Sequence, residues 1–160
     1  MMINKINIIC ILFFSAFSYA QEVVGDFNND KIDDTLTYKC YKVDEIKEIH
    51  EPTCKITLVL GQSKKNYNFN INYVSSPVIS NCGPGCILLY DTSADTEYTQ
   101  EYTYFSKYNN WILTKDETLY KDENGKIENN IPKNYLLSID NKKYPLKKNT
   151  KTSKRKVSKK

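Results

Sequence analysis

The chain has 160 residues, 40% of them hydrophobic, and a formal net charge of +4. It is long enough for one domain with a hydrophobic core and too short for two ordinary ones. Ten of the 23 basic residues lie in residues 142–160, where no acid occurs, and one is Lys5, so 12 basic residues accompany 19 acidic ones in residues 21–141. The body therefore carries about −7 and the tail +10, which excludes a uniformly basic protein.

The N-terminus is typical of a secretory signal peptide. Lys5 precedes an apolar stretch from Ile6 to Phe17, and Ser18-Tyr19-Ala20 ends it with small residues two apart. This pattern predicts cleavage after Ala20. The stretch is well short of the roughly 20 residues that span a bilayer, and no other stretch is apolar enough to do so. We therefore expect residues 1–20 to be removed and the protein to be exported, to the periplasm or the extracellular space.

An acidic segment follows, from Gly25 to Asp34, with oxygen-bearing side chains at alternate positions. Calcium loops place oxygen ligands at positions 1, 3, 5, 7 and 9. Counted from the first aspartate, these are the side chains of Asp26, Asn28, Asp30 and Asp34 and the carbonyl of Ile32. Four acids within nine residues repel one another without a cation, so the sequence predicts a structural Ca²⁺ site.

Two departures from the EF-hand pattern leave an alternative open. Lys31 stands where glycine usually makes the sharp turn, and Thr37 stands where an EF-hand has its bidentate glutamate. Aspartate, asparagine and glycine also dominate ordinary turns. A solvated acidic turn without a metal is therefore the alternative interpretation.

Three strands are predicted next, because apolar and polar residues alternate or β-branched residues cluster. They cover residues 35–41, 54–60 and 67–73. Between the first two, residues 42–50 could form a short helix or a polar loop. The last strand alternates without a break, with three asparagines on its polar face.

Four cysteines follow the signal peptide: Cys40, Cys54, Cys82 and Cys86. An even number in an exported chain predicts disulfides. Three pairings are possible, and the one local in sequence joins Cys40 to Cys54 and Cys82 to Cys86. The alternative, a four-cysteine zinc site, requires closer spacing than that between Cys40 and Cys54.

The segment between the last two cysteines is a candidate binding tip. Gly83, Pro84 and Gly85 require a tight reversal of the chain. A rigid turn loses little entropy on binding, so these three residues could contact a partner.

The C-terminal half continues the strand pattern. We expect a short strand at 87–90, a long alternating strand at 97–108 that turns at Asn109-Asn110 into residues 111–115, a polar segment at 116–130 and a last strand at 135–139. Tyr98, Tyr102 and Tyr104 could form a surface cluster, since tyrosine is enriched at protein interfaces. The prediction is an all-β, mainly antiparallel, sandwich-like single domain at 21–141, with a disordered Lys-rich tail at 142–160.

The sequence predicts no catalytic residue. His50 is the single histidine and lies in a charged segment without a surrounding motif. The acid pairs Glu97/Glu101 and Asp116/Glu117 could serve a small secreted hydrolase, which remains a minor alternative. The basic tail could bind an anionic envelope polymer by charge, or have no partner. A nucleic-acid partner is not expected for an exported chain.

The acidic segment Gly25-Asp26-Phe27-Asn28-Asn29-Asp30-Lys31-Ile32-Asp33-Asp34 resembles the calcium motif of FG-GAP/VCBS-type repeats, Gly-Asp-Phe-Asn-Gly-Asp-Gly-x-x-Asp. Only one copy occurs, so a propeller is not implied. The arrangement is similar to small secreted bacterial proteins in which one such motif follows the signal peptide and an aromatic hairpin, here 104–113, comes later. That group includes periplasmic immunity proteins against lysozyme-like toxins. The resemblance implies a non-enzymatic inhibitor of a lysozyme-like peptidoglycan hydrolase. A calcium-stabilised cell-surface or adhesin-like binding module is the alternative.

Overall fold

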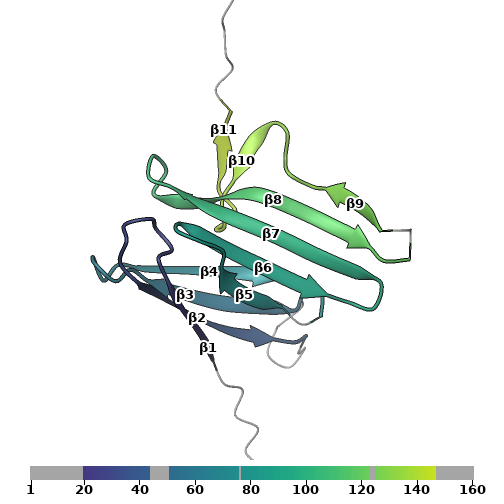
Figure 1. The fold of residues 1–160 in the computed structure, drawn as a ribbon, viewed down its shortest axis with the longest axis horizontal. Helices are drawn as coiled ribbons and strands as arrows, with labels where there is room; N and C mark the ends of the chain where they lie inside the picture. Colours follow the sequence, from purple (N-terminus) through teal and green to yellow (C-terminus); the bar gives the residue numbers. More distant parts are fainter. Residues whose placement is uncertain (1–19, 44–50, 76, 123–124, 147–160) are drawn as a thin grey trace, which may run out of the picture.

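The computed structural model of the chain describes residues 20–43, 51–75, 77–122 and 125–146 (Figure 1). Within these ranges the chain forms strands β1 to β11 and no helix. The strands form three sheets, and every pair within them is antiparallel. The predicted all-β, antiparallel fold is confirmed.

The first sheet has four strands in chain order. They are β1 (Gln21–Gly25), β2 (Asp34–Tyr41), β3 (Thr53–Val59) and β4 (Asn66–Asn72). The last three match the predicted strands to within one residue, because a strand with one buried face has a single favourable register. β1 is too short to show alternation in the sequence. Its pairing with β2 makes the acidic segment the connection of a hairpin.

The second sheet has five strands, also in chain order. They are β5 (Val78–Asn81), β6 (Cys86–Thr92), β7 (Thr96–Phe105), β8 (Asn110–Tyr120) and β9 (Lys126–Asn129). The predicted β7–β8 hairpin is confirmed. The polar segment expected at 116–130 instead continues β8 and adds β9. Strands with both faces partly exposed carry no apolar alternation that the sequence could reveal.

Both disulfides have the predicted local pairing. Cys40 lies directly opposite Cys54 in the β2–β3 register and is bonded to it. Cys82 is bonded to Cys86 at the β5–β6 turn. Two disulfides in a small β domain fit an oxidising compartment.

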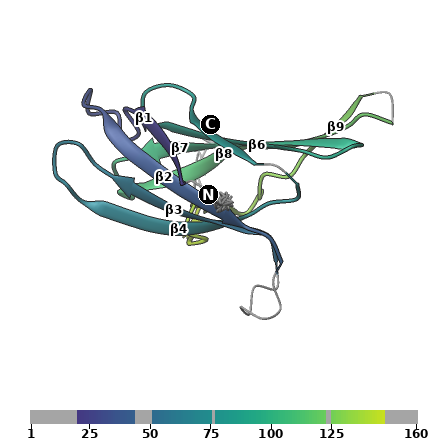
Figure 2. The ribbon, with the colours of Figure 1, turned by 90° about the horizontal axis from the view of Figure 1, so that it is seen from below.

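The two large sheets pack face to face and enclose the core (Figure 2). Each contributes its inward alternate side chains, among them Leu36 and Ile56 from the first sheet and Ile87 and Trp111 from the second. β1 and β5 lie beside each other and close one side of the sandwich. At this contact a β-carbon on Gly25 would lie 2.8 Å from Asn81 Nδ2, so any larger residue would displace the Asn81 side chain.

A small third sheet covers part of the opposite side. It consists of β10 (Tyr135–Leu137) and β11 (Lys143–Pro145). Ser138 forms a β-bridge with Ile112, and the Ile139 amide donates to the Trp111 carbonyl (2.9 Å). The sequence predicts a domain end at residue 141, but β11 lies beyond that boundary. Tyr144 explains the extension, because its ring packs on Tyr108 with centroids 4.4 Å apart.

Asp140→Asn is expected to flatten the acid limb of the stability–pH profile. The Asp140 carboxylate accepts hydrogen bonds from Asn110 Nδ2 (2.9 Å) and Ser138 Oγ (2.6 Å) and pairs with Lys142 Nζ (2.6 Å). Burial alone would raise the pKa of Asp140, but these partners outweigh it and lower the pKa to about 2. Because the unfolded-state pKa is about 3.9, the carboxylate stabilises the fold above that pH and loses this effect as the pH falls towards 2.

Urea unfolding at pH 5 and pH 2 measures this contribution. Allowing for screening at a partly exposed site, the wild type should lose about 1–2 kcal/mol more than Asp140→Asn between the two pH values. Asp122→Asn, at an exposed position after β8, serves as the control. Identical profiles for the Asp140 variant and the wild type would contradict the assignment.

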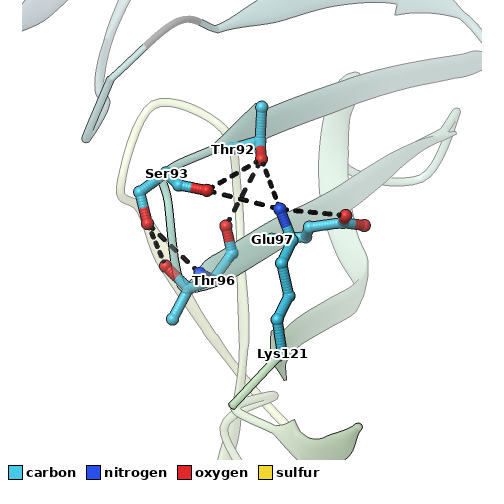
Figure 3. Close-up of polar contacts among 5 residues, drawn as sticks. All are labelled: Thr92, Ser93, Thr96, Glu97 and Lys121. Carbon is cyan, nitrogen blue, oxygen red and sulfur yellow. Dashed lines mark hydrogen bonds and ion pairs between the residues drawn. The ribbon is translucent and has the colours of Figure 1, made fainter.

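A polar cluster at the β6–β7 turn of the second sheet has a structural role. Lys121 Nζ donates to Thr92 Oγ1 (3.1 Å) and the Ser93 carbonyl (3.3 Å) and pairs with Glu97 (3.3 Å) (Figure 3). The Ser93 and Thr96 hydroxyls hydrogen-bond to each other across the same turn (2.6 Å). The cluster fastens the β6–β7 turn to the end of β8.

Several predictions lie outside the described residues. These are the signal peptide through residue 19, most of the helix or loop at 42–50, His50, and the tail from 147 to 160. No helix in the described part of the chain is long and apolar enough to cross a membrane.

Candidate functional site

The acidic loop, residues 26–33, is organised by its own side chains. Asp26 accepts hydrogen bonds from the amides of Asp30 (3.1 Å) and Lys31 (2.9 Å). Asn28 Oδ1 accepts from the Asp30 amide (3.1 Å), and Asp30 Oδ1 accepts from the Ile32 amide (2.9 Å). Each predicted ligand side chain in this stretch therefore turns back onto the loop and satisfies its backbone donors.

Two residues in the loop adopt left-handed backbone conformations. Asn29 has φ of 61° and Lys31 has φ of 69°. Asparagine visits this region readily, but lysine does so at a cost of roughly 1–2 kcal/mol. Lys31 thus keeps the conformation that glycine has at this position of a calcium loop, as the motif requires.

Asp34 anchors the loop to the first sheet. Its side chain is fully buried and accepts hydrogen bonds from the Phe27 amide (2.9 Å) and the Gly61 amide (2.7 Å). Burial raises the pKa of Asp34, the two amide hydrogen bonds lower it, and the nearby carboxylates of Asp30 and Asp26 raise it again, with a net rise. The carboxylate therefore joins the two ends of the acidic loop to the turn after β3.

The same loop also contacts the second sheet. Trp111 Nε1 donates to the Phe27 carbonyl (2.5 Å), and the Gly85 amide donates to the Asp26 carbonyl (2.8 Å). Asn81 Nδ2 donates to that same carbonyl (3.3 Å). The acidic loop is therefore a junction, hydrogen-bonded to both sheets and to the Cys82–Cys86 loop.

The Cys82–Cys86 loop is fixed from several sides. Gly83 and Gly85 have φ of 135° and 74°, which only glycine adopts without strain. The Cys86 amide donates to the Gly83 carbonyl (3.0 Å), and the Tyr104 amide donates to the Gly85 carbonyl (2.7 Å). Pro84 is exposed, as predicted for a binding tip, but Gly85 is buried against the acidic loop. Gly85 therefore does not face a partner, contrary to the prediction, and instead holds the Cys82–Cys86 loop against the acidic loop.

The three tyrosines predicted as a surface cluster are not one. Tyr102 is only 7% exposed and belongs to the core, where burial, and next the charge of Asp116, raise its pKa to about 12. Tyr104 packs on Trp111 with ring centroids 5.1 Å apart. Tyr98 lines a separate small pocket of about 120 Å³. Alternation places all three on one face of β7, but that face is turned towards the sandwich interior.

The predicted calcium ligands have oxygen chemistry that suits the ion. Asp26, Asn28 and Asp30 lie together in the loop. The Asp34 carboxylate is buried instead, where it accepts hydrogen bonds from the two backbone amides described above. The Ile32 side chain is exposed, and its amide donates to Asp30 Oδ1. In the described ranges, no group of three or more histidine, cysteine, aspartate or glutamate side chains is placed to hold a metal ion. Calcium binding stays a prediction.

The carboxylates considered for hydrolysis are engaged elsewhere. Glu97 pairs with Lys121, and Lys115 pairs with both Glu101 (3.7 Å) and Glu117 (3.3 Å). Burial raises the pKa of Asp116, although a hydrogen bond with Gln100 lowers it. The Glu101–Lys115–Glu117 pairs form a ladder on one face of β7–β8, whereas Asp116 and Gln100 lie opposite each other on the other face.

Comparisons with protein-family models, with curated proteins and with solved structures found no match to this chain. The resemblance of the acidic motif therefore has no independent support.

Proposed function

We propose that the chain is an exported, non-enzymatic binding protein that blocks a lysozyme-like peptidoglycan hydrolase, with Ca²⁺ as a structural ion in the acidic loop. The observation that carries the proposal is the Cys82–Cys86 loop, which presents the exposed Pro84 on a fixed backbone. A hydrolase that acts on a polymer has an open cleft, and a narrow rigid loop fits such a cleft.

The energetics favour this loop over the other candidates. Binding costs roughly 0.5–1.5 kcal/mol for each rotamer-rich side chain that becomes ordered. The loop avoids most of this cost, because its disulfide and the Gly85–Asp26 hydrogen bond hold it in one conformation.

Pro84→Arg should weaken inhibition of the target hydrolase at least tenfold. The substitution adds a long charged side chain at the tip, while any residue can adopt the conformation of proline there. The assay measures clearing of a peptidoglycan suspension by each of a panel of lysozyme-like muramidases in the presence of the mature protein. Pro145→Arg changes an exposed proline in β11 and is the matched control.

Two results would contradict the proposal. One is that no muramidase of the panel is inhibited and none is retained from envelope extract on the immobilised protein. The other is that the protein clears peptidoglycan by itself, which would make it a hydrolase.

Calcium should raise the thermal unfolding midpoint of the wild type and have little effect on Asp30→Asn. A ligand at 100 times its dissociation constant stabilises a fold by about 2.7 kcal/mol. Asp30→Asn removes one charge, and the amide oxygen can still accept from the Ile32 amide. Asp33→Asn is the matched control, since this residue is exposed in the same loop and falls between the predicted ligand positions.

The measurement is scanning calorimetry with EDTA and with millimolar CaCl₂. Equal calcium shifts for Asp30→Asn and Asp33→Asn would show that the ion does not bind at the predicted ligands. The inhibitor role could still hold in that case, because it depends on the Cys82–Cys86 loop.

A further inference from the structure

A pocket of about 250 Å³ lies where β4, the β7–β8 turn and the segment between β10 and β11 meet. None of its lining residues belongs to the acidic loop or to the Cys82–Cys86 loop. Drug-sized ligands occupy roughly 300–1,000 Å³, so this pocket is suited to a smaller molecule of about one ring. It is therefore a second site, independent of the inhibitor role proposed above.

Aromatic rings form much of the pocket wall. Tyr67 meets Trp111 edge to face with ring centroids 5.1 Å apart. Tyr108 and Tyr144 lie against each other at 4.4 Å, and both line the pocket. These rings come from three separate parts of the chain and pack in two pairs. Such faces favour a ligand with a flat array of C–H bonds, as in a pyranose ring.

Oriented polar groups stand beside these rings. Asn109 Oδ1 accepts hydrogen bonds from the Tyr67 hydroxyl (3.0 Å) and the Tyr104 hydroxyl (2.8 Å). The opposite side of this amide, Nδ2, is left to donate to a ligand. Asn110 and Asp140 are hydrogen-bonded to each other (2.9 Å) at the same pocket. The Asn110 side chain is already bonded at both ends, because its Nδ2 donates to Asp140 and Tyr144 and its Oδ1 accepts from the Trp111 amide. Asn109 Nδ2 is therefore the amide group that can meet a sugar hydroxyl.

The charge of the pocket differs from that of the body around it. Lys65 and Lys142 line it together with Asp140. Lys142 is paired with Asp140 (2.6 Å), whereas Lys65 Nζ lies 4.6 Å from the centre of the Tyr67 ring. The pocket is therefore positive by one charge in a body of about −7. Lys65 is exposed and reaches the aromatic wall, where it would meet an anionic substituent on a bound ring.

We propose that this pocket binds a single acidic sugar residue, a pyranose ring that carries a carboxylate. The sugar ring lies against Tyr67 and beside the Tyr108 ring, and Asn109 Nδ2 donates to a ring substituent. Lys65 Nζ moves from its place over the Tyr67 ring to pair with the carboxylate. A free sugar and the end of a glycan chain share this chemistry.

The test compares two sugars that differ by one lactyl ether group, which carries a carboxylate. N-acetylmuramic acid and N-acetylglucosamine have the same N-acetylated ring, and the former adds a lactyl carboxylate. Binding is followed by calorimetry and by the fluorescence of Trp111, the only tryptophan in the chain and part of the pocket wall. A soluble glycan fragment with terminal N-acetylmuramic acid forms a third arm and separates a chain end from a free sugar.

The wild type should bind the acidic sugar saturably and about tenfold more tightly than the neutral one, as expected for a charge-assisted pair. Lys65→Gln should abolish this difference. Tyr108→Ala should weaken both sugars, while Tyr41→Ala, which removes a tyrosine from β2 that does not line the pocket, should weaken neither.

Lys65 is exposed, so Lys65→Gln remains informative even if Tyr108→Ala fails to fold. Absence of saturable binding of either sugar and of the glycan fragment would overturn the proposal. So would equal binding of the two sugars by the wild type.

Discussion

Gly61→Ala is expected to lower the free energy of unfolding by more than about 3 kcal/mol. A β-carbon at Gly61 would lie 2.0 Å from the Asp33 carbonyl oxygen and 2.9 Å from Ile32 Cγ2. The first contact is with backbone, which cannot move without displacing the acidic loop, so the cost should exceed the usual 1–3 kcal/mol of overpacking. The Gly61 amide would also lose its position against Asp34 Oδ1.

Urea unfolding of the purified variant measures this loss. Gly125→Ala is the control, because Gly125 has φ of 74° but its β-carbon would meet nothing closer than Leu119 at 3.9 Å. That variant should lose only about 1–2 kcal/mol, the cost of the left-handed conformation. A smaller loss for Gly61→Ala than for Gly125→Ala would show that the acidic loop does not pack tightly on the turn after β3.

Asp34→Ala is expected to cost about 4 kcal/mol. Each buried donor left without an acceptor costs about 1–3 kcal/mol, and the substitution removes the acceptor of both the Phe27 and the Gly61 amide. Removal of a buried charge returns part of this cost, since burial raises the pKa of Asp34. The measurement is made in EDTA, so that any bound calcium does not contribute.

Asp33→Ala provides the comparison. It removes the neighbouring carboxylate, which is exposed, and should change stability by less than about 0.5 kcal/mol. Equal effects of the two substitutions would indicate that net charge in the loop, and not the two amide hydrogen bonds of Asp34, controls stability.

Both predictions follow from the position of the acidic loop between the sheets. The alternation of Asp26, Asn28 and Asp30 predicts a structural Ca²⁺ site. In the structure these side chains shape the loop, and its backbone then contacts Trp111 and Gly85 of the second sheet. The loop is thus a structural element of the sandwich whether or not it also holds calcium.

The strands could be predicted where one face is buried. Residues 67–73 alternate because Phe69 and Ile71 enter the core, and the Cys40–Cys54 pair follows once β2 and β3 are paired. β9 could not be predicted, because Ile127 is 62% exposed and its neighbours are polar. A strand held mainly by backbone hydrogen bonds leaves no hydrophobic period in the sequence.

The candidate site was less predictable than the fold. Sequence spacing correctly placed Pro84 on an exposed turn, but it could not show that Gly85 is buried by Asp26, which is far away in sequence. Tyr102 was assigned to a surface cluster because tyrosine is enriched at protein interfaces, but tyrosine also occurs in cores. The pocket at Tyr67, Tyr108 and Tyr144 could not be predicted, because its lining residues come from three segments that are distant in sequence and form no local motif.

Native-state hydrogen exchange of the backbone amides tests the central claim, that the acidic loop joins the two sheets. The amides of Phe27, Gly61 and Gly85 donate to the acidic loop or to Asp34. If the loop is the junction, these amides exchange only through global unfolding, with the same opening free energy as the core strand residues Ile56 and Leu89. Exchange of Phe27 and Gly85 through a local opening, several kcal/mol below the global value, would contradict the account.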